Sequence, residues 1–255
     1  MAHHIHIGCC GWSYLNEGDF RELKGSKSTE SKLQSYAKLF DAVEINSTFY
    51  RLPRLSTVHK WREEVDGDNP GFEFTVKAFQ GITHFHRFQK QDSLNSYAVL
   101  KDICAALRTR LLLFQSPASF KPTQENIDRM RRFFGNVDRE GIVAVWEPRG
   151  KWYDEPEIIE NTCAECNLVH CVDPFRNDPL AFGEVKIAYF RLHGFGKPSM
   201  YRYGFSDEDL ILLRKKVRKL PKELEDVFVF FNNDTCYQNG RSFQILIRNP
   251  DDFPQ

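Results

Sequence analysis

Short runs of apolar residues recur along the whole chain, and most of them are separated by segments with helical spacing. The runs have the length of buried strands and end at Gly, Pro or polar residues, a pattern typical of a parallel sheet covered by helices. Eight runs are predicted as strands: Ile5–Cys10, the first part of Asp41–Pro53, Phe72–Lys77, Leu111–Gln115, Ile142–Glu147, Leu168–Asp173, Ala188–Gly194 and Val227–Asn233.

Helices are predicted between most of these strands. In Ser206–Leu220, Ser206 is expected as the N-cap. A polar loop with the sequence GITHFHRFQKQD is expected after the third strand, and no proper helix is expected in Pro174–Lys186. The predicted helices are Ser31–Phe40, Leu55–Val65, Ser93–Leu107, Thr123–Phe134, Asp154–Cys166, Ser206–Leu220 and a short last helix, Ser242–Arg248.

Strands that alternate with helices in this number predict an α/β fold, a (β/α)₈ TIM-like barrel. The helix between strands six and seven is degenerate in this interpretation. A doubly wound open sheet is the competitor, but it usually needs fewer strands. No linker, repeat or low-complexity tract divides the chain, so residues 1–255 are expected to form a single barrel domain.

Polar side chains gather where the predicted strands end. Val43 and Ile45 alternate with Glu44 and Asn46, so one face of that strand is apolar while the other holds a carboxylate and an amide. Residues two apart share a face of a strand, and barrel enzymes build their sites at the carboxyl ends of strands. We therefore expect one rim to collect Glu44, Asn46, Thr75, Lys77, Gln115, Glu147, Asp173, Arg191, His193, Asn232 and Asn233.

Composition narrows the class of protein. The chain has 35 Lys plus Arg and 35 Asp plus Glu, and this balance argues against a generic nucleic-acid coat. Seven cysteines without regular spacing favour reduced thiols, and hence a cytoplasmic protein. No signal peptide or membrane span is apparent, so no membrane partner is expected.

The chain resembles the YecE-like family, domain of unknown function 72 (DUF72), in motifs that span nearly its whole length. These are GCCGWSY, VEINSTFYRLP, LFQSPASF, WEPRGKW, YFRLHG and VFFNN. The resemblance implies a TIM barrel whose activity is not established. Cys10 and Gly150 depart from the family pattern. The resemblance places signature residues at Glu44, Asn46, Tyr50, Arg51, Lys77, His84, Gln115, Glu147, Arg149, Asp173, Arg191, His193 and Asn232.

The leading functional hypothesis is an enzyme of hydrolase or lyase type that acts by acid–base chemistry on an anionic small molecule or nucleotide-like substrate. Glu44 and Glu147 are the expected proton-transfer pair, and a desolvated rim would tune their pKa values. The catalytic candidates are Glu44, Glu147, Asp173, Lys77, His193 and Arg191.

Substrate binding is expected from the loops beside this rim. A phosphate or carboxylate is expected near Gly194, Gly196 and Lys197, and near the segment 239–242 leading into the last helix. Aromatic and Arg side chains on the loops can stack a base or sugar ring. The binding candidates are Asn46, Tyr50, Arg51, His84, Gln115, Arg149, Trp152, Gly194, Gly196, Lys197, Tyr201, Asn232, Asn233 and Trp12.

Other interpretations stay open. A metal-dependent endonuclease or isomerase can use the same carboxylates and His193 as ligands of a divalent metal, although nearby cations oppose it and no cofactor is predicted. A non-catalytic protein that binds a nucleotide or single-stranded nucleic acid is a third. A glycosidase is disfavoured because strands four and seven end without a carboxylate. Cys163 and Cys166 lack a second pair for a zinc site. The oligomeric state is not predicted.

Overall fold

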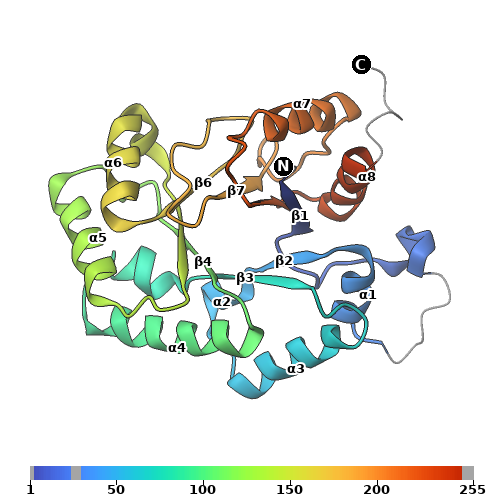
Figure 1. Cartoon of the computed structure of the whole chain (residues 1–255), viewed down its shortest axis with the longest axis horizontal. Helices are drawn as coiled ribbons and strands as arrows, with labels where there is room; N and C mark the ends of the chain where they lie inside the picture. The colour runs from blue at the N-terminus through green and yellow to red at the C-terminus, as the bar shows by residue number, and fades with distance from the viewer. Residues whose placement is uncertain (1–2, 24–29, 249–255) are drawn as a thin grey trace.

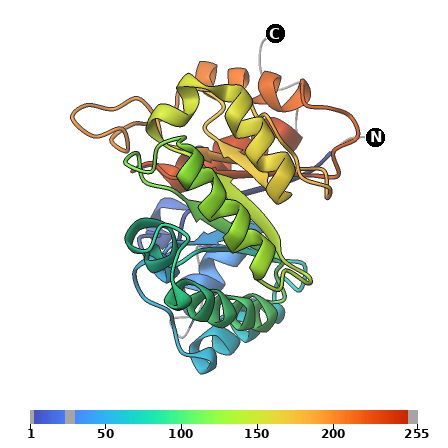
Figure 2. The same cartoon turned by 90° about the vertical axis from the view of Figure 1, so that its left-hand side faces the viewer.

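Eight parallel strands form a closed barrel in chain order, with the last strand paired to the first. In the computed structural model, which describes residues 3–23 and 30–248, helices surround these strands (Figures 1 and 2). The predicted α/β barrel is confirmed. The strands are β1 (His4–Cys9), β2 (Ala42–Ile45), β3 (Glu73–Lys77), β4 (Leu111–Gln115), β5 (Val143–Glu147), β6 (Val169–Val172), β7 (Ile187–Leu192) and β8 (Asp226–Phe231).

Helices follow seven of the eight strands within the described residues. They are α1 (Lys32–Leu39), α2 (Ser47–Tyr50), α3 (Leu55–Asp66), α4 (Gln91–Leu107), α5 (Gln124–Asn136), α6 (Pro156–Cys166), α7 (Asp207–Arg218) and α8 (Cys236–Arg248). Between β6 and β7 the fully described chain makes turns and one isolated bridge but no helix, as the sequence predicted. This connection and α7 line a cavity of about 700 Å³ that includes Phe182 and Leu212.

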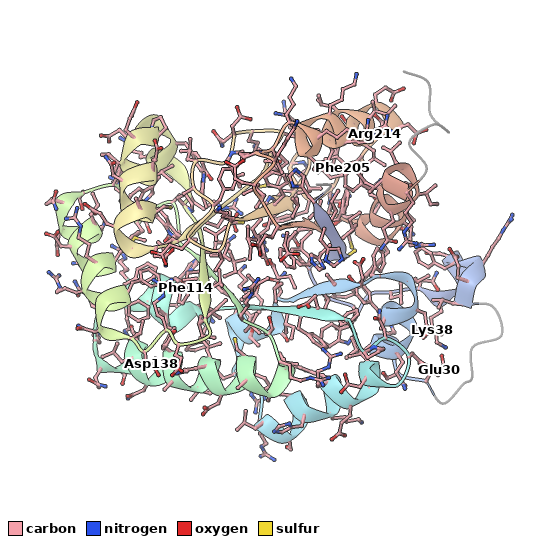
Figure 3. The ribbon with its side chains drawn as sticks, in the orientation of Figure 1. Glu30, Lys38, Phe114, Asp138, Phe205 and Arg214 are labelled. Atoms are coloured by element: carbon pink, nitrogen blue, oxygen red, sulfur yellow. The ribbon has the colours of Figure 1, made fainter. Side chains whose placement is uncertain are left out.

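Alternation along the strands separates two apolar regions. Ile45, Val76 and Leu192 face outward and are buried in the layer between strands and helices. Phe114 of β4 also lies there, with its ring 5.2 Å from that of Phe134 in α5 (Figure 3). Inward-facing residues form a separate cluster that fills the barrel: Ala42, Leu111, Leu113, Val145, Val169, Cys171, Ile187, Tyr189, Phe228 and Phe230. The barrel is therefore a packed core, with space for chemistry only at its ends.

Capping residues fix several helix starts. Ser206 accepts from the backbone N–H of Asp209, and the Asp209 carboxylate accepts from the Ser206 backbone N–H, a reciprocal capping box. Thr123 caps α5 in a simpler way, through its hydroxyl. Ser206 was predicted as a cap because Ser followed by acidic residues marks a helix start.

Two local predictions are wrong. The last helix begins at Cys236 rather than Ser242, because the buried Asn239 and Gly240 pack inside its first turns and hide the apolar period. The expected polar loop after β3 instead forms a helical turn at Gly81–Phe85 that buries Ile82 and Thr83. Both segments are polar in sequence but ordered by contacts with the barrel.

No helix among residues 3–23 and 30–248 combines the length and the hydropathy needed to span a membrane.

Candidate functional site

The carboxyl ends of the strands bring the predicted ionisable residues together. Lys77, Gln115 and Glu147 are the last residues of β3, β4 and β5. Asp173 directly follows β6, and Arg191 and His193 lie at the end of β7. Because all eight strands run in parallel, these ends form one rim, as the sequence predicted.

Arg191 is the centre of the rim. It is 1% exposed, and its Nε and Nη2 atoms lie 3.0 and 2.9 Å from the two carboxylate oxygens of Glu44. Its Nη1 donates to Glu147 Oε2 at 2.6 Å. One guanidinium therefore joins carboxylates from β2 and β5, which lie on different sides of the barrel. Such charge-assisted, two-pronged contacts are among the strongest hydrogen bonds in proteins.

The ionic network continues from Glu147 to β6. Arg149 pairs with Glu147 Oε1 and its Nη2 lies 3.0 Å from His193 Nε2. His193 Nδ1 lies 3.5 Å from Asp173 Oδ2, and the same oxygen accepts from the His193 backbone N–H at 3.1 Å. One continuous network of acidic and basic groups thus crosses the rim from Glu44 to Asp173.

The network fixes the charge of Glu147. Burial acts to raise the pKa of this carboxyl, but the charges of Arg191 and Arg149 outweigh burial and hold the pKa well below its ordinary value. Glu147 is therefore ionised at neutral pH, and it is positioned as an anionic partner of the two arginines rather than as a proton donor.

His193 is neutral at pH 7 because, unlike at Glu147, the effect of burial outweighs that of the neighbouring charges. Burial lowers the pKa of its imidazole, although Asp173 and Glu147 act to raise it. Because Arg149 can only donate, His193 Nε2 is assigned as the acceptor and Nδ1–H points to Asp173. A substrate anion that attracts Arg149 would free this Nε2 lone pair to take a proton.

Lys77 is a cation of the rim that is available to a ligand. Its Nζ lies 4.4 Å from the centre of the Phe49 ring, and the side chain is only 8% exposed. Within the described part of the chain, no ion pair or hydrogen bond holds this Nζ. Burial and the neighbouring Arg191 charge lower the pKa of Lys77 to about 8, against the opposing effect of the two glutamates. A buried amine of this kind exchanges protons near neutral pH.

The structure adds Tyr189, a residue that sequence reasoning missed. Tyr189 donates its hydroxyl to Glu44 Oε2 at 2.8 Å and lies 2.8 Å from Thr75 Oγ1. Arg191 Nη2 also approaches Cys10 Sγ at 3.8 Å. The signal for Tyr189 was its position two residues before Arg191, on the same face of the strand.

Most predicted binding residues lie around the rim. Gln115 Nε2 donates to Glu147 Oε2 at 2.8 Å. Asn46 donates to the Cys10 carbonyl, while its buried Oδ1 has no partner among the described groups.

Other predicted binding residues lie farther out on the same side of the barrel. The half-buried His84 ring shares a hydrogen bond with Thr83 Oγ1, and burial lowers the pKa of the ring. Tyr50 at the end of α2 and Arg51 directly after it are exposed, and half-buried Asn232 directly follows β8. Trp12 packs edge-on against Trp61.

The loop after β7 is close to His193. Gly194 has φ +88°, and a Cβ there would meet the Tyr203 side chain at 2.4 Å, so a side chain cannot replace it without a shift. The ring of Tyr201 lies 5.7 Å from that of His193. Gly196 packs closely against the backbone of Arg202, which leaves no room for a Cβ, and Lys197 is exposed.

Three predicted binding elements have structural roles instead. Trp152 is fully buried, packs against Trp146 at 4.7 Å and donates its indole N–H to the Phe120 carbonyl. Asn233 donates to the Tyr203 carbonyl at 2.7 Å and to Asn239 at 2.9 Å, so it holds the loop after β7. The segment 239–242 lies inside α8 and offers no free helix start for an anion.

Exposed aromatic rings surround the rim. They all lie in segments that follow strands β1, β2, β3 or β7, at the carboxyl side of the barrel, and two of them end short helical segments. Large exposed side chains of this kind mark binding surfaces when they gather on one face. The rings are Tyr14, Tyr50, Phe85, Phe195 and Tyr201.

The rim fits a divalent metal poorly. Arg191 lies between Glu44 and Glu147, and Arg149 lies between Glu147 and His193. A metal bound by these carboxylates would have to displace the guanidinium groups that now neutralise them. The arrangement instead offers fixed cations and a neutral imidazole to a substrate.

Comparison with known proteins identifies relatives. The family profile described as "Protein of unknown function DUF72" matches residues 6–248. The UPF0759 protein YunF of Bacillus subtilis (strain 168) is 25% identical to this chain over 95% of this chain and 94% of YunF. The UPF0759 protein YecE of Escherichia coli (strain K12) is 30% identical over 47% of this chain and 40% of YecE.

Solved structures share the barrel. A DUF72 family protein from Thermotoga maritima MSB8 matches with a TM-score of 0.73 and 22% identity, over 96% of this chain and all of that chain. A xylose isomerase domain containing protein from Salmonella typhimurium LT2 matches with a TM-score of 0.52 and 11% identity, over 83% of this chain and 89% of that chain. At these identities the similarity shows the fold alone.

Proposed function

The chain belongs to the DUF72 family, as its sequence motifs predicted, and we propose that it is an enzyme acting at the carboxyl-end rim of its barrel. The proposed reaction is acid–base chemistry of hydrolase or lyase type. The proposed substrate is a small molecule with a phosphate or carboxylate group, and the exposed aromatic rings around the rim favour a substrate that also contains a ring.

The observation that supports this proposal best is the state of Lys77. Its amine is desolvated at the rim, lies over the Phe49 ring, and has a pKa lowered to about 8. A merely structural lysine would be expected to pair with Glu44 or Glu147, but Arg191 takes both carboxylates. Perturbed groups of this kind concentrate at functional sites.

Within this proposal, Lys77 and His193 replace Glu44 and Glu147 as the proton-transfer groups. Glu44 is fully buried and bound by both Arg191 and Tyr189, so it orients these two side chains. Glu147 stays ionised and holds Arg149 beside His193. Arg149, with its side chain 26% exposed, is positioned to bind the substrate anion.

Binding is the first test, with inorganic phosphate, citrate and adenosine monophosphate as probes in a thermal-shift titration. We expect at least one probe to stabilise the protein, and Lys77→Gln and Arg149→Gln each to weaken that binding about tenfold or more, since charged hydrogen bonds contribute roughly 1.5–3 kcal/mol. Lys219→Gln, which removes an exposed charge beyond α7, is the matched control. Equal probe binding in all variants would contradict the proposed anion site.

Turnover is the second test. The wild type is incubated with a mixture of phosphate esters and hydroxy acids, and products are followed by NMR. Products that form with the wild type and with Lys219→Gln, but not with Lys77→Gln or His193→Asn, are the expected result. Turnover that survives both rim substitutions would overturn the assigned roles.

A further inference from the structure

We propose a second site, for one divalent transition metal ion of the Zn²⁺ class, formed by His4, His6 and Asp226 at the amino end of the barrel. It is independent of the rim and of the proposed reaction. Among the described residues, this is the group of His, Cys, Asp and Glu whose ligand atoms all lie within 4.8 Å of one another. The ion would join the first strand to the last.

The backbone places the three side chains together. His4 and His6 are two residues apart on β1 and so share a face of the strand. Asp226 begins β8 and is paired in register with His4 across the seam that closes the barrel. Side chains that are 220 positions apart in sequence, those of His6 and Asp226, are thereby brought into contact.

Two distances between donor atoms are close to those of tetrahedral coordination. His6 Nε2 lies 3.0 Å and His4 Nδ1 lies 3.5 Å from Asp226 Oδ1. Two ligands that each bind zinc at about 2.0–2.1 Å in a tetrahedral site are roughly 3.3 Å apart. The two observed distances lie on either side of this value, and the three ligand atoms all lie within 4.8 Å of one another, so rotation of the exposed His4 side chain can bring the remaining pair to this spacing.

Two of the three ligands are already oriented. His6 is 6% exposed and stacks on Phe228, with ring centroids 4.4 Å apart and planes at 6°. The side chain of Asp226 is 20% exposed, and Arg110 Nη2 lies 3.7 Å from its other oxygen, Oδ2. Arg110 can therefore stay in place and orient the carboxylate while Oδ1 binds the metal, as outer partners of metal ligands do.

The third ligand leaves the site accessible. The side chain of His4 is 74% exposed and can turn toward the metal, and the exposed side provides room for a water molecule as the fourth ligand. Two imidazoles and one carboxylate suit Zn²⁺ better than Mg²⁺ or Ca²⁺, which prefer oxygen ligands alone. The neighbouring His3 donates its Nδ1–H to the Leu224 carbonyl and lies outside the cluster.

The experiment titrates metal-free protein with ZnCl₂ by calorimetry and with Co²⁺ by visible absorption. We expect one ion per chain, a Co²⁺ spectrum typical of four-coordinate geometry, and a melting temperature that rises with ZnCl₂ because the ion binds the folded chain. His4→Asn and Asp226→Asn should each weaken binding about 100-fold or more, beyond the roughly 10–100-fold lost when only an outer partner of a ligand is removed. His3→Asn is the matched control.

Two results would overturn the site. One is binding to the wild type no tighter than to His4→Asn. The other is an equal loss in His3→Asn, which would mean chelation by the histidine-rich N-terminal segment rather than at the seam. Because His4 is exposed, its replacement should not disturb folding, and circular dichroism of each variant checks this.

Discussion

Arg191 binds Glu44 through two nitrogen atoms, at 3.0 and 2.9 Å, in a contact that is closed to solvent. The pair links β7 to β2 across the mouth of the barrel, and the remaining nitrogen of the guanidinium reaches Glu147. Three formal charges are buried here, two negative and one positive, and Arg149 supplies the second positive charge by pairing with Glu147.

Removing Arg191 should destabilise the protein strongly. In Arg191→Met, Glu44 and Glu147 stay buried without their main cation, and breaking a buried pair in this way costs about 3–5 kcal/mol. Urea unfolding should show this loss, whereas Arg131→Met, at an exposed pair with Glu165, should change stability by about 0–1 kcal/mol. The triple variant Arg191→Met, Glu44→Gln, Glu147→Gln should recover much of the loss; no recovery would refute the electrostatic cause.

Glu147 should make stability depend on pH in the acid range. Its folded pKa lies well below the ordinary 4.5, so its contribution is complete above about pH 4.5 and is lost as the pH falls toward the folded pKa. The slope for one such group is about 1.4 kcal/mol per pH unit. Glu147→Gln should be less stable than the wild type at pH 7, and the two should converge in acid. Parallel curves from pH 7 to pH 3 would contradict this, with Glu165→Gln as the control.

Lys77 should titrate near pH 8. Burial favours its neutral amine, so the fraction of free amine rises as the pH increases through about 8. Reductive ¹³C-methylation followed by NMR at several pH values should resolve one lysine signal that titrates there. That signal should disappear in Lys77→Gln and persist in Lys151→Gln. A signal that titrates near 8 in both variants would belong to another group.

Trp152 should matter for stability and not for binding. It packs on Trp146 and bonds the Phe120 carbonyl, so Trp152→Ala should cost about 3–5 kcal/mol in unfolding experiments. Probe binding at the rim, measured below the melting temperature of the variant, should be unchanged. If the milder Trp152→Phe lost probe binding without a loss of stability, this would contradict a purely structural role and support the predicted role of Trp152 in substrate binding.

Alternation along strands explains how much of the rim could be predicted. Glu44, Lys77, Glu147 and Arg191 were identified because side chains two apart share a face and because parallel strands end at one edge. Their pairing could not be predicted, since it depends on which strands face each other across the barrel. The sequence therefore suggested two glutamates for proton transfer, whereas the geometry binds both to one arginine.

Helix ends were harder to predict where polar residues are buried. Asn239 looked like a loop residue, but its side chain accepts from the Phe205 and Asn233 N–H groups and donates to the Phe205 carbonyl. Such tertiary contacts leave no periodic signal in the sequence. The buried contacts of Trp152 likewise leave no signal in the sequence. Its position among aromatic residues of the loops therefore suggested that its ring stacks on a substrate.

The late position of Arg191 in the chain has a consequence for synthesis on the ribosome. Glu44 emerges long before Arg191, whose guanidinium binds both of its oxygens, so a nascent chain that ends before β7 would hold the Glu44 carboxylate in a closed interior without this partner. We expect such truncated chains to stay open and accessible to chaperones, and the barrel to close only after β7 and β8 have been translated.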